Sequence, residues 1–172
     1  MRTQITAESV ENASSQFWEQ MLGMSLTRVH KGTVSDSALD RRHVLGSCEL
    51  TGVWNGRIEV RISMGLALHA TAAMLMQSPG QVQPEDMLDA AREIANMIAG
   101  TIKSALPRPC AMSVPSAEIA DRQVGSPTRA AGLLSVFFRH SEGTFQVSVC
   151  EESPLARPEI SVGWLIPATA MA

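Results

Sequence analysis

No uninterrupted apolar run reaches the roughly eighteen residues that a membrane-spanning helix requires. Residues 1–15 also lack the apolar core of a signal peptide. The net charge is −3, and Lys and Arg do not cluster, which argues against nucleic acid as a partner. From these absences we expect a cytoplasmic protein that neither enters a membrane nor binds nucleic acid.

Motifs that carry cofactor or metal chemistry are missing as well. The three cysteines, Cys48, Cys110 and Cys150, are far apart and form no CxxC pair, and the histidines show no ligand spacing. The phosphate- and nucleotide-binding patterns GxGxxG and GxxxxGK[ST] and the hydrolase pattern GxSxG are absent too. We therefore expect reduced, buried thiols and no cofactor or metal bound by this chain.

What the chain does contain is the composition of one globular domain. It has 172 residues, of which 45% are hydrophobic and 18% charged, enough for a single core. The expected elements are, in order, a helix over residues 7–24, a strand over 26–34, a β-hairpin over 43–63, a short apolar helix over 65–77, a long helix over 86–106, an extended segment over 110–120 and a second hairpin over 133–152. This order predicts an α+β fold, an antiparallel-rich β-sheet with two long helices packed on one face. Residues 1–152 would form the domain, and residues 153–172 a C-terminal tail that is loosely attached or a late strand.

The first hairpin carries a strong turn signal. Asn55 and Gly56 suit the two central positions of a type I′ turn, both of which need positive φ. After the turn, Ile58, Val60 and Ile62 alternate with charged residues, so we expect one face of the strand on the core and the other in water.

The long helix over residues 86–106 has two different faces. Apolar residues recur along one of them at steps of three and four. A second stripe follows the same steps on the opposite face and holds Asp89, Glu93, Asn96, Gly100 and Lys103. The simpler interpretation of this stripe is an ordinary solvated face, in which Asp89 pairs with Arg92.

Three features of the stripe are unfavourable for a merely solvated face. Asp89 and Glu93 are like charges four residues apart, which costs a few tenths of a kcal/mol, roughly. Asn96 has poor helix propensity in mid-helix, and Gly100 costs about 1 kcal/mol relative to Ala. The alternative interpretation is a carboxylate and an amide presented one turn apart, with Gly100 leaving room for the backbone of a partner.

Several stretches resemble the CheX/CheC family of bacterial chemotaxis phosphatases, and CheX more closely. The segment DAAREIANMIAG is similar to the helix signature of that family through Asp89, Glu93 and Asn96. The hairpin and the Ala-rich helix before it are in register with this likeness, as is MSVPSAEI after it, in which Pro115 corresponds to the family's proline. The first helix has no second Glu-x-x-Asn, as in single-site, CheX-like members. The likeness covers residues 8–151.

The resemblance implies hydrolysis of the aspartyl phosphate of a CheY-like response regulator, which would itself supply the phosphorylated Asp and the Mg²⁺. It assigns catalysis to Asn96 and Glu93: the neutral amide would orient the attacking water, as the Gln of GTPases does, and the carboxylate would meet a lysine of the regulator. Asp89 would assist docking, Gly100 would allow close approach, and Pro115 would shape the adjoining strand. A homodimer that pairs through its sheets is also implied.

Two other hypotheses stay open on the sequence. Pro115 follows Asn96 by fewer residues than is usual in the family, which keeps open a catalytically silent docking module that binds a signalling protein. The other is a structural homodimer component that neither binds a regulator nor turns it over. The phosphatase hypothesis requires Glu93 and Asn96 to be exposed side by side, so burying them would exclude it.

Overall fold

A computed structural model of the protein describes residues 5–30, 42–121 and 133–151. The elements are α1 (Ala7–Leu22), β1 (Thr27–Val29), β2 (Arg42–Gly52), β3 (Gly56–Ser63), α2 (Met64–Leu75), the 3-10 helix η1 (Pro79–Gln81), α3 (Pro84–Ser104), β4 (Cys110–Met112), β5 (Ser116–Asp121), β6 (Leu133–His140) and β7 (Gly143–Glu151). None of the helices within these ranges is long and apolar enough to cross a membrane. The expected tail, residues 153–172, and the end of the strand expected over 26–34 lie outside the described residues.

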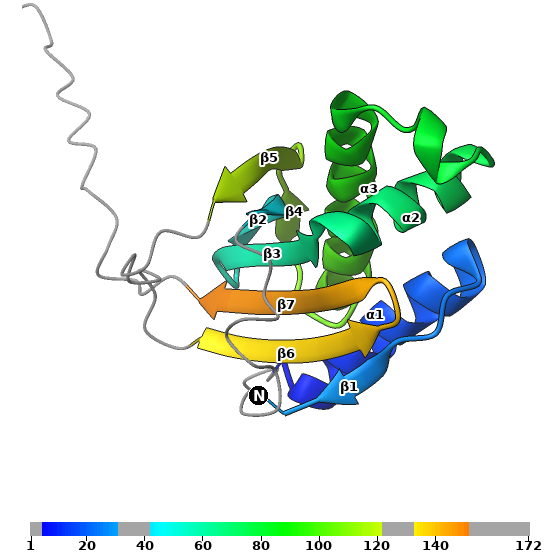
Figure 1. Cartoon of the computed structure of the whole chain (residues 1–172). Coiled ribbons are helices and arrows are strands. Elements are labelled where there is room, and N and C mark those ends of the chain that lie inside the picture. Colours follow the sequence, from blue (N-terminus) through cyan, green and yellow to red (C-terminus); the bar gives the residue numbers. More distant parts are fainter. Residues whose placement is uncertain (1–4, 31–41, 122–132, 152–172) are drawn as a thin grey trace, which may run out of the picture.

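Within the described residues, seven strands form one sheet in the order β1-β6-β7-β3-β2-β4, and β5 pairs with β2 alongside β4. Every pairing within it is antiparallel. The long helices α1 and α3 cover one face of this sheet, and α2 packs against both of them where β3 ends (Figure 1). The α+β prediction is therefore confirmed, with α2 as a third helix beside the two long ones.

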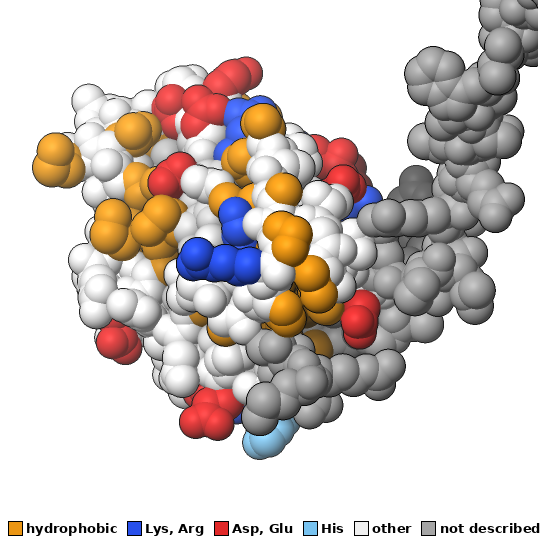
Figure 2. All heavy atoms as spheres, turned by 180° about the vertical axis from the view of Figure 1, so that it is seen from behind, with side chains coloured by type: hydrophobic (Ala, Val, Ile, Leu, Met, Phe, Trp, Pro, Cys, Tyr) orange, Lys and Arg blue, Asp and Glu red, His pale blue; other side chains and the backbone are white. Residues whose placement is uncertain are grey.

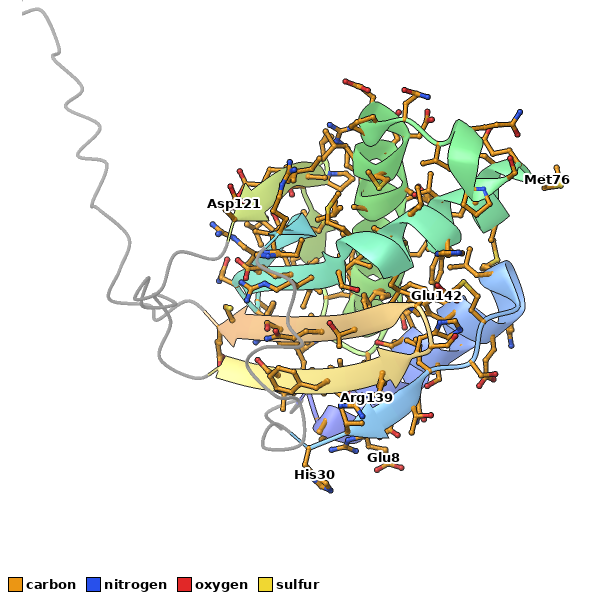
Figure 3. The ribbon with its side chains drawn as sticks, in the orientation of Figure 1. Glu8, His30, Met76, Asp121, Arg139 and Glu142 are labelled. Atoms are coloured by element: carbon orange, nitrogen blue, oxygen red, sulfur yellow. The ribbon has the colours of Figure 1, made fainter. Side chains whose placement is uncertain are left out.

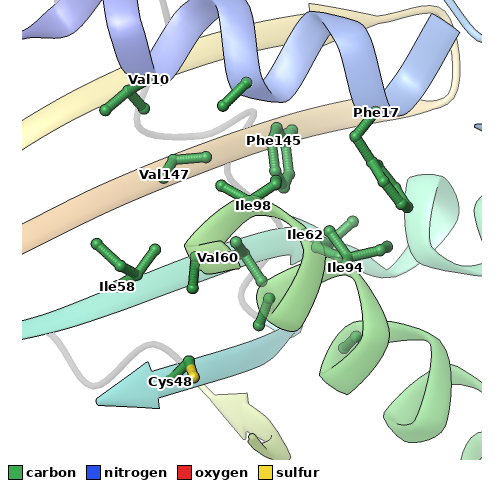
Figure 4. Packing of buried hydrophobic residues seen from close by; sticks show 14 of the residues in the cluster. Val10, Phe17, Cys48, Ile58, Val60, Ile62, Ile94, Ile98, Phe145 and Val147 are labelled. Atoms are coloured by element: carbon green, nitrogen blue, oxygen red, sulfur yellow. The ribbon is translucent and has the colours of Figure 1, made fainter. Parts of the chain in front are cut away.

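The hydrophobic core lies between the sheet and the helices (Figure 4). Ile58, Val60 and Ile62 of β3 are buried, as their alternation predicts, and they belong to the same core cluster as Ile94 and Ile98 of α3. Burying an aliphatic side chain of this size contributes about 1.5–3 kcal/mol. The apolar face of α3 is thereby held against the centre of the sheet.

The boundaries of α3 differ by two residues from those expected, because it begins at Pro84 and ends at Ser104. Proline suits the first turn, where its missing N–H group would have no partner in any case. The backbone N–H of Gln83 donates to Asp86 Oδ2 at 2.8 Å, which closes the N-terminal cap. Lys103 in the last turn suits the negative end of the helix dipole.

The first hairpin forms, but the prediction of a type I′ turn at Asn55-Gly56 is wrong. The positive φ falls at Gly52 (147°), and neither Asn55 nor Gly56 has one. Asn55 instead binds back to Gly52, accepting its N–H through Oδ1 and donating to its carbonyl through Nδ2, both at 3.1 Å. Gly56 is buried in β3, where a Cβ would lie 2.3 Å from the carbonyl oxygen of Cys150. Asn55 is thus used for its side-chain hydrogen bonds, and Gly56 for its close packing against β7.

Polar contacts at the turn between β6 and β7 attach α2 to the sheet. The backbone N–H of Thr144 donates to the hydroxyl of Ser63, the residue before α2, at 3.0 Å. His69 Nδ1 lies 3.4 Å from Glu142 Oε2, and Figure 3 shows Glu142 at this turn, near α2. At its other end α2 stops at Met76, which has a positive φ of 51° and points into solvent (Figure 3).

The backbone of α3 rests directly on β2 at one point. A Cβ placed on Gly46 would lie 2.5 Å from the carbonyl oxygen of Ala91 and 2.9 Å from Val60 Cγ2. Since the first of these neighbours is backbone, it has no side chain to move aside. Only glycine lets the helix and the strand approach this closely.

We therefore expect Gly46→Ala to lower the free energy of unfolding by about 1–3 kcal/mol, because the added methyl overpacks the contact between α3 and β2. Urea denaturation measures the change. Gly80→Ala is the matched control, since a Cβ at Gly80 meets no atom within 4 Å. Equal stabilities of the two variants would show that the close approach does not limit the fold.

Candidate functional site

The outer face of α3 presents the residues that the sequence singles out. Asp89, Glu93, Asn96 and Gly100 follow one another at steps of four, three and four residues and so lie along one side of the helix. Glu93 is exposed and Asn96 is half-buried. From the rise of an α-helix, the two are about 4.5 Å apart along its axis. An acid and an amide are therefore open to solvent one turn apart.

Neither of these two side chains is engaged within the part of the chain that the structure describes. There, no hydrogen bond or ion pair joins the Glu93 carboxylate or the Asn96 amide to another residue. Asp89, by contrast, forms an ion pair with Arg92, which confirms the pairing expected from their spacing. The Asn96 amide keeps its carbonyl acceptor and its two N–H donors available for a ligand.

Gly100 is required by nothing inside the described chain. A Cβ added there meets no atom within 4 Å, and its φ is not in the positive range that favours glycine. Glycine in mid-helix costs about 0.5–1 kcal/mol relative to alanine. The fold itself would gain from a side chain at this position, so the need for glycine is best sought in what approaches α3 from outside.

Pro115 lies on a different element from the other candidates. It belongs to the break between β4 and β5, two short strands that both pair with β2 at the edge of the sheet. Ser113 bridges this break: its hydroxyl accepts the N–H of Glu49 at 3.0 Å, and its own N–H donates to the Glu49 carbonyl at 2.9 Å. Proline suits such an interruption because it has no N–H to donate.

A hollow of about 790 Å³ opens where the outer face of α3 meets β4. It is lined by residues from the end of α3, from β4 and from the chain between them: Gly100, Lys103, Ser104, Arg108, Pro109, Cys110 and Met112. The sequence placed Lys103 on the outer face of the helix but predicted no function for it, and it did not predict that Arg108 lies at the site. The sequence feature that could have indicated Arg108 is its position between two prolines directly after the helix.

All three cysteines are free thiols. Burial raises the pKa of the Cys48 and Cys150 thiols, which favours their neutral form at physiological pH. The expectation of a buried thiol is wrong for Cys110, which is only half-buried on the wall of the hollow. The reason is its strand, because β4 lies at the edge of the sheet and no further described strand covers it. The described residues include no group of three His, Cys, Asp or Glu placed to hold a metal ion.

Comparison with known proteins identifies the family. The model of the family described as chemotaxis phosphatase CheX matches residues 44–133, more than half of the chain, and this region includes the whole of α3. The chain belongs to the CheX family of chemotaxis phosphatases, as the resemblance of its motifs predicts. No curated protein sequence shows a significant match to it.

Solved structures support the fold. CheX from Desulfovibrio desulfuricans is 23% identical, with a TM-score of 0.66 over 85% of this chain and 98% of that one. CheX from Vibrio vulnificus is 18% identical, with a TM-score of 0.67 over 87% and 100%. A chain in the CheX–CheY–BeF3–Mg²⁺ complex from Borrelia burgdorferi is 16% identical, with a TM-score of 0.62 over 87% and 100%.

Because Gly100 faces open space, we expect Gly100→Ala to raise the free energy of unfolding by about 0.5–1 kcal/mol. Urea denaturation of the two proteins measures this difference. Gly46→Ala, which adds the same methyl group at a crowded glycine, should change stability in the opposite direction. A loss of stability in Gly100→Ala would mean that the fold itself requires glycine at this position.

Proposed function

We propose that this protein hydrolyses the aspartyl phosphate of a CheY-like response regulator, with Asn96 orienting the attacking water and Glu93 docking the regulator. Membership of the CheX phosphatase family supports the general activity. The observation that carries the residue assignment is that the exposed Glu93 and the half-buried Asn96 lie one turn apart on the outer face of α3, without partners among the described residues. A relative solved as a complex with CheY supports the choice of partner.

The reaction requires the phosphatase to form no covalent bond with the substrate. Water attacks phosphorus in line with the bond to the aspartyl oxygen, and the products are inorganic phosphate and the free Asp carboxylate of the regulator. The regulator supplies the phosphorylated Asp and the Mg²⁺, so this chain need bind no cofactor. Catalysis then depends on positioning and electrostatics, and positioning alone is worth several kcal/mol, on the order of 7 or more in favourable cases.

A neutral amide suits the task of holding that water. The Asn96 carbonyl accepts a hydrogen bond from the water and its NH₂ group donates one, and neither adds negative charge beside the phosphoryl group. A second carboxylate at this position would repel the phosphoryl oxygens. Since Asn96 stands on a helix packed on the sheet, its reach into the regulator is fixed by the fold.

The neighbours of Asn96 on the same face serve docking. Glu93 offers an unpaired charge to a lysine of the regulator, and such a pair at the rim sets register and association rate. Asp89 lies one turn further out, and its charge is already compensated by Arg92, so it assists docking more weakly. Gly100, one turn beyond Asn96, lets the backbone of the regulator approach the helix.

We further propose that the protein works in the cytoplasm as a homodimer paired through its sheets. The described sheet ends in β1 on one side and in β4 and β5 on the other. Strands at an edge leave backbone donors and acceptors that need covering, and a second copy supplies a regular partner for them.

Asn96→Ala should still bind the phosphorylated regulator but leave its decay at the spontaneous rate, because the positioned water is lost. The assay follows loss of radiolabel from the phospho-regulator. Asn12→Ala is the matched control, since Asn12 is an exposed helical asparagine on α1 and should keep the wild-type rate. Wild-type protein that binds regulators without hastening their decay would instead identify a catalytically silent docking module.

Glu93→Ala should raise KM for the phospho-regulator more than it lowers kcat, because an interaction made before and during the reaction is removed. The difference in KM should shrink as salt is added, since a rim charge is screened. Glu19→Ala, which removes an exposed acid on α1, controls for net charge. An unchanged KM in Glu93→Ala would rule out its docking role.

A further inference from the structure

Two positively charged side chains, Lys103 and Arg108, line the hollow beside Gly100, and no ion pair in the described chain accounts for them. Lys103 is half-buried and Arg108 is exposed. Within the described ranges, neither forms an ion pair. Among the described residues, Arg28, Arg42, Arg57 and Arg92 each form an ion pair with a carboxylate, whereas Arg61 of β3 forms none. In a chain with net charge −3, two neighbouring cations without acids indicate a surface kept open for negative charge.

Stabilisation of the helix accounts for only one of the two. Lys103 lies in the last turn of α3, where a cation is favourable beside the carbonyl end of the dipole. Arg108 lies four residues beyond the end of the helix and has no such role. Both nevertheless line the same hollow, together with the apolar Pro109 and Met112.

Charge along the outer side of α3 reverses between its two ends. Glu85 and Asp86 lie in the first turn and Glu93 near the middle, whereas Lys103 and Arg108 follow at the end. Figure 2 shows this face: acidic side chains gather at the top, where α3 begins, with one basic group among them, and further basic side chains lie near the centre between two groups of hydrophobic ones. The outer face of α3 is therefore a dipolar surface.

The proposed catalytic residue lies between the two charges. Glu93 and Lys103 are ten residues apart, which is about 15 Å along the helix axis. Asn96 lies between them along the helix, and Gly100 lines the hollow together with Lys103. The hollow also has the volume of a typical ligand pocket, roughly 300–1,000 Å³, which is room for a short segment rather than for a domain.

We propose that this hollow receives an acidic segment of the same phosphorylated regulator that docks at Glu93. The inference rests on the proposed function and adds an orientation to it. A basic side chain of the regulator meets Glu93, and an acidic segment about 15 Å away meets Lys103 and Arg108. The reversed orientation would place like charges together at both ends, which disfavours it. Two anchors of opposite sign thus bring the phosphoryl group to Asn96.

Arg108→Glu tests this directly, because Arg108 is exposed and lies outside the helix. We expect KM for the phospho-regulator to rise about three- to tenfold, as loss of one or two rim contacts allows, with kcat unchanged. Lys103→Gln, which removes the charge but keeps a polar side chain, should raise KM to a smaller extent. Raising the salt concentration should weaken docking of the wild type more than that of Arg108→Glu.

The matched control is Arg42→Glu, which makes the same change in net charge on an exposed side chain. Arg42 and Gly52 are the two ends of β2, about 33 Å apart for an extended strand, and Gly52 pairs with Cys110 on the wall of the hollow. Arg42→Glu should therefore keep the wild-type KM. An equal rise in KM in Arg42→Glu and Arg108→Glu would reduce the effect to net charge and overturn the proposal.

Failure of this inference is distinguishable from failure of the proposed function. If Arg108→Glu and Lys103→Gln keep the wild-type KM and salt dependence while Asn96→Ala abolishes turnover, the hollow has no part in docking and the phosphatase stands. If the wild type hastens the decay of no regulator, the phosphatase fails. The docking role of the hollow is then tested by measuring the affinity of the wild type and of Arg108→Glu for the BeF3-activated regulator. If the wild type does not bind, or if the two proteins bind equally well, the docking proposal is overturned.

Discussion

The contact between α3 and β2 at Gly46 determines how the rest of the site is presented. The carbonyl of Ala91 lies where the side chain of any other residue at position 46 would be, so the backbone of the helix rests directly on the strand. Glu93 and Asn96 follow Ala91 by two and five residues on the same helix. Close packing of the inner face of α3 against the sheet therefore fixes the orientation of its outer face, which carries Glu93 and Asn96.

The outer face of α3 is locally unfavourable, and the inner face compensates for it. A mid-helix asparagine, a mid-helix glycine and a pair of like charges four residues apart each weaken an isolated helix by a few tenths to about 1 kcal/mol. Burial of Ile94, Ile98 and their neighbours against the sheet contributes more than these costs. Residues that break local rules while the global fold supports them are expected at functional sites.

Helical periodicity was enough to predict α3, its two faces and the residues on them, because a helix places side chains by sequence spacing alone. The turn at Asn55 could not be predicted in the same way. Gly56 is constrained by its approach to Cys150 on β7, nearly a hundred residues away, and that contact outweighs the local preference of Asn-Gly. The hollow was missed for a similar reason, since it exists only because β4 folds back beside the end of α3. The half-exposure of Cys110 likewise follows from strand order, which local sequence does not encode.

The position of Cys110 has a practical consequence. Cys48 and Cys150 are buried, and burial raises the pKa of both thiols, whereas Cys110 is half-buried on the wall of the hollow. A maleimide fluorophore would therefore attach there in the native sequence, without engineering. Its emission would respond, in real time, to a partner that binds at the hollow lined by Lys103 and Arg108.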